Sequence, residues 1–148
     1  MTRVILVRGC AFPEDRYYHA DYNVWVQRGE NNIVTLGATS YGAALAIEFF
    51  AFTPKPVGTK IDAGRAVGLL ELSKTVVSVR TPVAGTLFEV NAAAVAKPAL
   101  ISADPYGAGW LVRLFTAENV EVHLLSGAAV APAFEAEMNL ENFAGRQA

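Results

Sequence analysis

A lysine, Lys74, stands at the centre of a run of strand-forming residues, 69–79, whose two halves nearly mirror each other. The mirror predicts a β-hairpin in which Ser73–Thr75 form the tip and Leu72 faces Val76. A lysine at such a tip presents a primary amine at the far end of a stiff β scaffold, with its aliphatic stem extending into solvent. An amine displayed in this way can be acylated by another enzyme, which removes its charge and attaches a new chemical group.

Turn residues frame this hairpin on both sides. Val57-Gly58 and Ala63-Gly64 precede it, and Pro82 and Gly85 follow it. A lysine in a hairpin turn is most often only a solvated charge, because turns are generally polar. The framing turns distinguish this lysine from that ordinary case.

The complete segment resembles the lipoyl-domain family, whose pattern is Val-Gly, Ala-Gly, a strand, Glu-x-x-Lys at a hairpin tip and Pro-x-x-Gly after the return strand. Glu71 and Lys74 match the glutamate and the modified lysine. The resemblance implies a barrel-sandwich hybrid in which lipoate is joined to Lys74 by an amide and acts as a swinging arm between active sites. It also implies a lipoate ligase or lipoyl transferase as partner, which could recognise Glu71.

Biotin carriers share this fold and also carry their cofactor on a hairpin lysine. Their lysine lies between methionines, whereas Lys74 lies between Ser73 and Thr75. The resemblance therefore favours lipoate, whose two sulfurs would supply thiol–disulfide chemistry that the protein itself need not provide.

More of the chain resembles one branch of the family, the H protein of the glycine cleavage system and its relatives. The most specific motif is Asp-Pro-Tyr-Gly-x-Gly-Trp at 104–110. The resemblance spans roughly residues 22–125, and its earlier matches are Trp25, Val34, Gly37, Thr39 and Tyr41. The implied role is that of a carrier in a multienzyme system and not of an enzyme.

Two departures separate the chain from the usual glycine-cleavage pattern. Asn23 and Val24 replace the His-Glu pair that usually precedes the tryptophan, and Thr75–Ser78 lacks the usual Ser-Asp. An acid that could lie near an aminomethylated arm is therefore missing. Residues 9–18 and 51–55 instead resemble the H-like lipoate-binding proteins of heterodisulfide-reductase-like sulfur oxidation.

The first interpretation is therefore a carrier whose arm shuttles sulfur intermediates. Its implied partners are a heterodisulfide-reductase-like iron–sulfur flavoprotein complex and sulfurtransferases. The alternative is a glycine cleavage system H protein that carries an aminomethyl group. A hypothesis of another class is an unmodified interaction module, or an enzyme that uses Cys10 as a nucleophile.

The elements that must position the lysine are mostly short strands. Alternating apolar residues predict a hairpin over 22–36 with its turn at 29–32. A further strand is expected over Ile47–Phe52, which prolines then stop. From 57 to 114, short β-branched runs between glycines and prolines predict a small sandwich or flattened barrel.

Short helices are expected among and after these strands. Thr39 or Ser40 can cap one helix and Asn91 another, because their side chains accept hydrogen bonds from amides that lack helical partners. Apolar residues at helical spacing predict a terminal helix over Pro132–Phe143. The expected fold is mainly β with a few short helices, a barrel-sandwich hybrid with a C-terminal helix.

The chain of 148 residues is long enough for one domain with extensions. We expect an N-terminal extension at 1–21, a lipoyl-binding H-protein-like domain at 22–125, and a C-terminal helical tail at 126–148 that packs on it.

Composition excludes several classes of protein. The formal charge of −2 lacks the basic excess that nucleic acids require. The most apolar central run, 41–52, is interrupted by Gly42 and Glu48, so no membrane insertion is expected. A single cysteine and no visible targeting segment fit a cytoplasmic protein.

Other reactive side chains give weaker signals. Cys10 could accept sulfur or form an intermolecular disulfide, but a lone cysteine beside Ala11 and Phe12 is more often a small buried hydrophobe. His19 and His123 have no cysteine partner at zinc spacing. No metal site is predicted.

Overall fold

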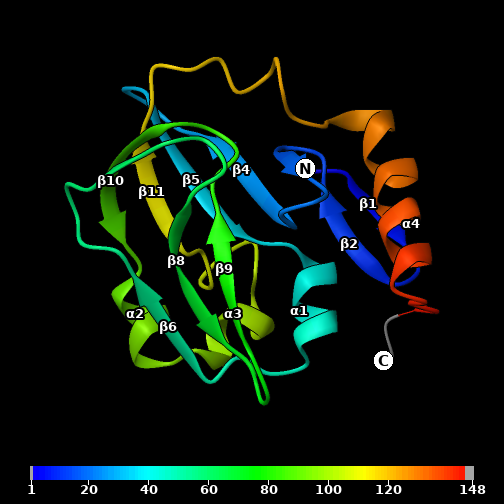
Figure 1. The fold of residues 1–148 in the computed structure, drawn as a ribbon. Helices are drawn as coiled ribbons and strands as arrows, with labels where there is room; N and C mark the ends of the chain where they lie inside the picture. Colours follow the sequence, from blue (N-terminus) through cyan, green and yellow to red (C-terminus); the bar gives the residue numbers. More distant parts are fainter. Residues whose placement is uncertain (1, 146–148) are drawn as a thin grey trace.

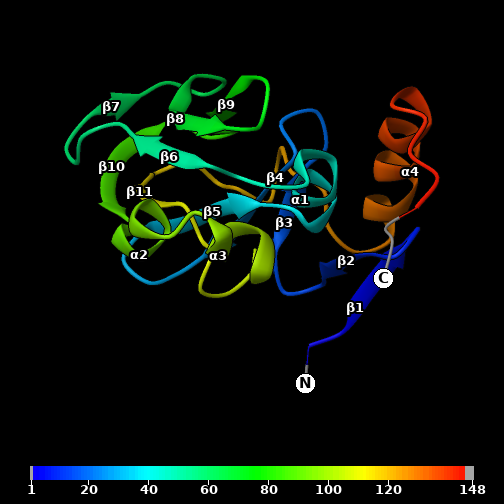
Figure 2. The same cartoon turned by 90° about the horizontal axis from the view of Figure 1, so that it is seen from below.

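The computed structural model describes residues 2–145, and its strands form two facing layers with a separate hairpin beside them (Figure 1). Within these residues the larger layer is an antiparallel sheet in the order β3 (Tyr17–His19), β4 (Val24–Arg28), β5 (Ile33–Ala38), β11 (Val112–Phe115), β10 (Gly85–Val90) and β7 (Lys60–Ile61). The smaller layer has the order β6 (Ala51–Pro54), β8 (Ala66–Glu71) and β9 (Val76–Arg80). Figure 2 shows the smaller layer lying over the larger one.

Aliphatic side chains from both layers fill the space between them. Val26, Leu36 and Leu114 from the larger sheet and Val67 and Leu70 from the smaller one are buried in one core cluster. Along β11 the inward positions alternate with more exposed ones, as expected where a sheet has one solvated face. On β4, Val24, Trp25 and Val26 are buried in succession, because Trp25 lies in a second cluster on the other face of the sheet. The mainly β fold predicted from the sequence is confirmed, including its lipoyl-domain-like architecture.

A second, smaller core joins the chain ends to the sandwich. The hairpin of β1 (Val4–Val7) and β2 (Cys10–Pro13) packs against α4 (Val130–Leu140), which follows a 3-10 turn, η1 (Gly127–Ala129) (Figure 2). The rings of Phe12 and Phe134 lie 4.4 Å apart between them.

The expected C-terminal helix is present but starts two residues earlier, at Val130, and ends at Leu140 instead of Phe143. Residues 146–148 of the expected tail and Met1 of the expected extension lie outside the described residues. Within the expected extension, β3 pairs with β4 and so lies in the larger sheet.

The two shorter predicted helices are also present. The Thr39 side chain caps α1 (Ser40–Ala46), and the Asn91 side chain caps α2 (Ala92–Ala96). A further helix, α3 (Ala99–Ala103), was not expected because Pro98 was interpreted only as a stop. Proline is well suited to start a helix, since its fixed φ matches the helical value and its missing N–H has no helical partner to lose.

The β8–β9 hairpin is confirmed, but its register differs by one residue from the predicted mirror. The N–H of Leu72 donates to the carbonyl of Thr75 at 2.8 Å, and Val76 faces Glu71. The prediction that Leu72 faces Val76 is therefore wrong. Ser73–Lys74 alone form the loop, so the chain reverses within two residues.

The strand predicted over Ile47–Phe52 begins later, at Ala51. Ile47 has a φ of 66°, and the N–H of Glu48 donates to the carbonyl of Ala46 at 2.7 Å. These values describe a γ-turn, which reverses the chain directly after α1. The aromatic and β-branched composition of the segment did not reveal this turn.

Candidate functional site

Lys74 lies at the tip of the β8–β9 hairpin, which projects at the bottom of the molecule in Figure 1. Its side chain is exposed, and within residues 2–145 no hydrogen bond or ion pair holds it. The hairpin below it is firmly supported, because β8 pairs with β6 on one side and β9 on the other. The amine is therefore accessible on a stiff support.

Glu71 lies at the same end of the hairpin as Lys74. It is the last residue of β8, its side chain is exposed, and its backbone carbonyl accepts the N–H of Phe50 at 2.8 Å. The backbone contact fixes where the carboxylate leaves the strand. A protein that approaches Lys74 therefore meets the Glu71 carboxylate close by.

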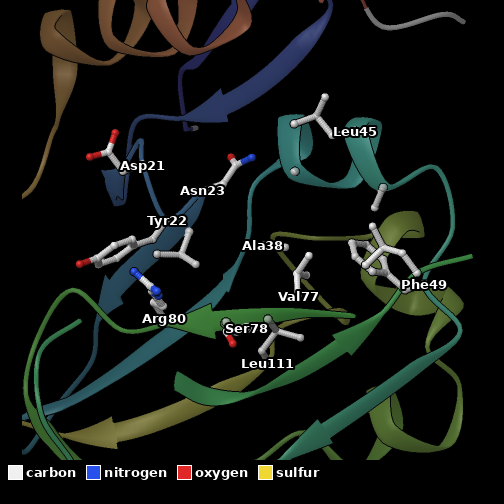
Figure 3. Close-up of a pocket in the computed structure, with 15 residues that line it drawn as sticks. Asp21, Tyr22, Asn23, Ala38, Leu45, Phe49, Val77, Ser78, Arg80 and Leu111 are labelled. Atoms are coloured by element: carbon white, nitrogen blue, oxygen red, sulfur yellow. The ribbon is translucent and has the colours of Figure 1, made fainter. Parts of the chain in front are cut away.

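A pocket of about 360 Å³ opens beside the hairpin along the outer edge of β9 (Figure 3). Most of its walls come from the β3–β4 turn with the start of β4, helix α1 with the turn after it, and β9, and single residues Ala38, Leu72 and Leu111 complete them. Its apolar lining includes Leu45, Phe49, Leu72, Val77 and Leu111. Because these side chains come from both layers and from α1, the sandwich holds the pocket open.

Two charged side chains border the pocket, Arg80 and Asp21. The Arg80 guanidinium carbon lies 5.7 Å from the centre of the Tyr22 ring, within the range of a cation–π contact. No carboxylate of the described chain forms an ion pair with Arg80. Asp21 instead lies against the carboxyl group of Glu137 on α4, and burial first and Asp21 second raise the pKa of Glu137.

Asn23 fixes the turn that forms the upper wall. Its backbone has a φ of 58°, a conformation that asparagine tolerates better than most residues. The Thr39 hydroxyl donates to the Asn23 side-chain oxygen and accepts the N–H of Gly42 at 3.0 Å. One threonine therefore caps α1 and ties it to the β3–β4 turn.

Trp25 joins the wall of the pocket to the second core. Its indole N–H donates to the carbonyl of Pro105 at 3.0 Å, and Arg16 lies 4.5 Å above its ring. Gly37 of β5 pairs with Trp25, and a Cβ atom at this position would clash with the indole ring. Trp25, Gly37 and the 104–110 motif therefore form one packing unit.

These residues fit a lipoyl arm. Lys74 has the exposed amine that an amide to lipoate would need, and the adjacent pocket has the apolar surface that would cover a hydrocarbon chain and its sulfurs. The pocket lies on the same strand, β9, that leads away from the lysine.

Sequence patterns predicted Lys74 and Glu71 as site residues but did not indicate Tyr22, Phe49 and Arg80, which line the pocket. They lie in stretches that only sheet pairing and the packing of α1 bring together. The one local signal was Arg80, a charged residue that ends an otherwise β-branched strand.

The other reactive side chains stand apart from the lysine. Cys10 is fully buried in the second core, which agrees with its interpretation as a small hydrophobe. His19 stacks on Tyr22, and His123 is exposed. Across residues 2–145, no three His, Cys, Asp or Glu side chains gather as metal ligands would. None of the helices described has the length and hydropathy needed to cross a membrane.

Comparison with known proteins assigns the family. The glycine cleavage H-protein model matches residues 16–137. Glycine cleavage system H protein 5 of Aquifex aeolicus is 40% identical over 111 residues, which cover 73% of this chain and 75% of that protein. The glycine cleavage system H protein of Beutenbergia cavernae is 41% identical over 120 residues, 80% of this chain and 93% of that protein.

A solved structure gives the same result. The crystal structure of a glycine cleavage system H protein from Mycobacterium marinum superimposes with a TM-score of 0.73 at 32% identity, covering 86% of this chain and 99% of that one. These names refer to glycine cleavage, and none of them refers to sulfur oxidation. The chain therefore belongs to the glycine cleavage H-protein family, whose members are carriers and not enzymes and hold lipoate covalently on a lysine.

Proposed function

We propose that Lys74 is the lipoylated residue and that the chain is a carrier that presents this arm to partner enzymes in turn. The observation that supports this most is the exposed, unbonded lysine at the tip of a hairpin that adjoins an apolar pocket. Lipoate supplies a pair of sulfurs that can exchange between disulfide and dithiol. The protein's own task is to hold the amide end, shelter the arm and release it.

The hairpin presents the amine of Lys74, and the pocket shelters the arm. The two-residue loop keeps the amine in solvent, where a lipoate ligase or lipoyl transferase can reach it, and Glu71 offers a carboxylate for that enzyme to recognise. Amide formation removes the charge of the lysine. An uncharged stem can then lie against the side chains of Leu72 and Val77 without losing the hydration of an ammonium group.

The first candidate for the cargo is an aminomethyl group in glycine cleavage. Its support is the family match and the names of the relatives, which align over most of the chain. The partners would then be the other enzymes of a glycine cleavage system.

The second candidate is a sulfur intermediate of sulfur oxidation, with a heterodisulfide-reductase-like complex and sulfurtransferases as partners. Its support is the small set of polar side chains that border the otherwise apolar pocket. Asn23 and Ser78 stand at positions where the usual glycine-cleavage pattern has other residues, and Arg80 adds a cation. A cationic aminomethyl group has no unpaired acid on the β9 side of this pocket.

Intact mass tests the attachment site. We expect the protein from its native host to carry the mass of one lipoyl group, the Lys74→Arg variant to lack it, and the exposed-lysine control Lys60→Arg to keep it. Arginine retains the charge but offers no amine for an amide bond to lipoate. A lipoyl group that persists in Lys74→Arg would contradict the assignment.

The cargo is tested with the lipoylated protein. If it supports glycine decarboxylation by the other cleavage enzymes at the rate of a reference H protein, the aminomethyl candidate holds and the sulfur candidate fails. If it does not, the aminomethyl candidate fails.

A further inference from the structure

We propose that Arg80 makes the pocket discriminate between loaded forms of the arm by their charge. A group attached to the arm is held in the pocket more tightly when it is anionic than when it is neutral or cationic. The inference rests on the proposed lipoylation of Lys74. It adds a specificity-determining residue and a chemical class of cargo, namely groups that carry a carboxylate, sulfonate or similar anion on one of the arm's sulfurs.

The first argument is that Arg80 carries an uncompensated charge. It ends β9 at the mouth of the pocket, over the Tyr22 ring, and no ion pair within the described residues neutralises it. A cation–π contact leaves the outer edge of the guanidinium free to donate hydrogen bonds. Planar N–H groups of this kind bind carboxylates and other oxyanions in pairs.

The second argument is that the acid of the pocket faces elsewhere. In Figure 3 the Asp21 carboxylate points up and away from Val77 and Ser78. It lies toward α4, where it meets the carboxyl group of Glu137. Arg80 therefore supplies the formal charge on the wall of the pocket that β9 forms.

The third argument is that an uncharged hydrogen-bond donor, the backbone N–H of Ser78, lies along the same wall of the pocket. β9 is the outer strand of its sheet. Because Leu72 and Thr75 form a hydrogen-bonded pair, alternation along the antiparallel ladder turns the backbone N–H and carbonyl of Ser78 outward, away from β8.

The apolar walls of the pocket strengthen the interaction between Arg80 and an anion. Charge interactions weaken in water and strengthen beside surfaces of low dielectric constant. Arg80 lies beside a lining that includes Val79 and Leu111, both buried. An anion attached to the arm would enter next to these walls, whereas a cation there would meet the guanidinium, because the Asp21 carboxylate points away from β9. The preference should weaken as salt concentration rises, because Arg80 is at the surface.

Three chemically defined adducts test the inference on the lipoylated protein. After reduction, iodoacetate, iodoacetamide and 2-bromoethylamine each replace the thiol hydrogens of the arm, with loss of halide and a proton. They leave anionic, neutral and cationic thioethers of similar size. Peptide mass mapping confirms that both thiols of the arm are modified and that the buried Cys10 is not. The readouts are the melting temperature and the hydrogen exchange of the amides at 77–80.

We expect the anionic adduct to melt about 2–4 °C above the neutral one and the cationic adduct to melt lowest. Exchange at 77–80 should be slowest in the anionic adduct. In Arg80→Gln the three adducts should behave alike, and in Arg80→Glu their order should reverse. Arg65→Gln is the matched control, because Arg65 is exposed and lies outside the pocket, so the wild-type order should remain.

The outcomes separate this inference from the proposed function. If Lys74 carries no lipoyl group, the missing mass overturns both. If the lipoylated protein gives three adducts with the same melting temperature and exchange, the inference alone is overturned. The same conclusion follows if the order persists in Arg80→Gln.

Discussion

At the scale of single residues, His19 supports the wall of the pocket through its neutral form. Its ring stacks on Tyr22 at 3.9 Å, and its Nδ1 accepts the N–H of Tyr22 at 3.1 Å. Burial lowers the pKa of His19, and the nearby Asp21 carboxylate opposes this only in part. A protonated ring would have no lone pair for the Tyr22 amide, so the fold prefers the neutral imidazole.

Acidification should therefore destabilise the protein through His19. Because its pKa is lower in the folded state than the unfolded value of 6.5, its contribution to stability is complete above pH 6.5 and is lost as the pH falls toward the folded pKa. We expect the ring-proton resonances of His19 to titrate with a midpoint below 6.5. The His19→Asn variant identifies the signal by its loss, and a midpoint above 6.5 would contradict the expectation.

At the scale of elements, the turn between α1 and β6 stores strain beside the pocket. Ile47 has φ 66° and ψ −59°, values that strain a β-branched side chain. Its side chain is 79% exposed, so little apolar burial compensates for the strain. The neighbouring Ala46 and Phe49 line the pocket, so the turn sets the position of one wall.

Replacing Ile47 with glycine should stabilise the protein. Relief of backbone strain is worth about 1–3 kcal/mol, and the added flexibility of glycine in the unfolded chain costs about 0.5–1 kcal/mol. The expected net gain is about 1 kcal/mol, or a rise in melting temperature of about 2–4 °C. Ile47→Ala is the control, because alanine keeps the Cβ atom and the strain. Thermal unfolding that ranks Ile47→Gly below Ile47→Ala would show that the turn is not strained.

Elements with a local cause were predictable from the sequence, and those fixed by distant partners were not. Thr39 and Asn91 cap their helices through bonds to amides two or three residues away, so their types alone indicated α1 and α2. The register of the β8–β9 hairpin depends on the loop geometry, which the mirror pattern did not contain. Lys74 was predicted as a site residue because its motif is local, whereas Arg80 borders the pocket only through the placement of β4 and α1.

At the scale of the whole molecule, the chain ends form a brace on the side of the sandwich away from the lysine. Figure 1 shows α4 and the β1–β2 hairpin together at one side, while the tip of the β8–β9 hairpin projects below. Phe134 and Met138 are fully buried in this brace, and Arg8 donates to the carbonyl of Phe143 at 2.8 Å. This placement leaves the tip of the β8–β9 hairpin uncovered by α4 and the β1–β2 hairpin.

The contact between Glu137 on α4 and Asp21 at the pocket rim couples the brace to the site through charge. Burial, Asp21 and Glu141 all raise the pKa of Glu137, so folding favours its protonated form. The stabilisation linked to that proton is complete below the unfolded value of 4.5 and is lost as the pH rises through the folded pKa. At neutral pH two carboxylates then repel each other where α4 meets the β3–β4 turn.

Glu137→Gln removes this repulsion and keeps the side-chain volume. We expect the variant to melt above the wild type at pH 7 and to lose that advantage near pH 4, because the wild-type carboxyl group is then uncharged as well. The control is Glu135→Gln, an exposed residue of the same helix for which we expect no such advantage. Melting curves from pH 4 to pH 7 measure the difference. If the melting temperature of Glu137→Gln follows that of the wild type over this range, the carboxyl pair does not strain the brace. Asp21 is then not engaged by Glu137 and can act as an acid of the pocket. That result would count against Arg80 as the dominant charge of the pocket.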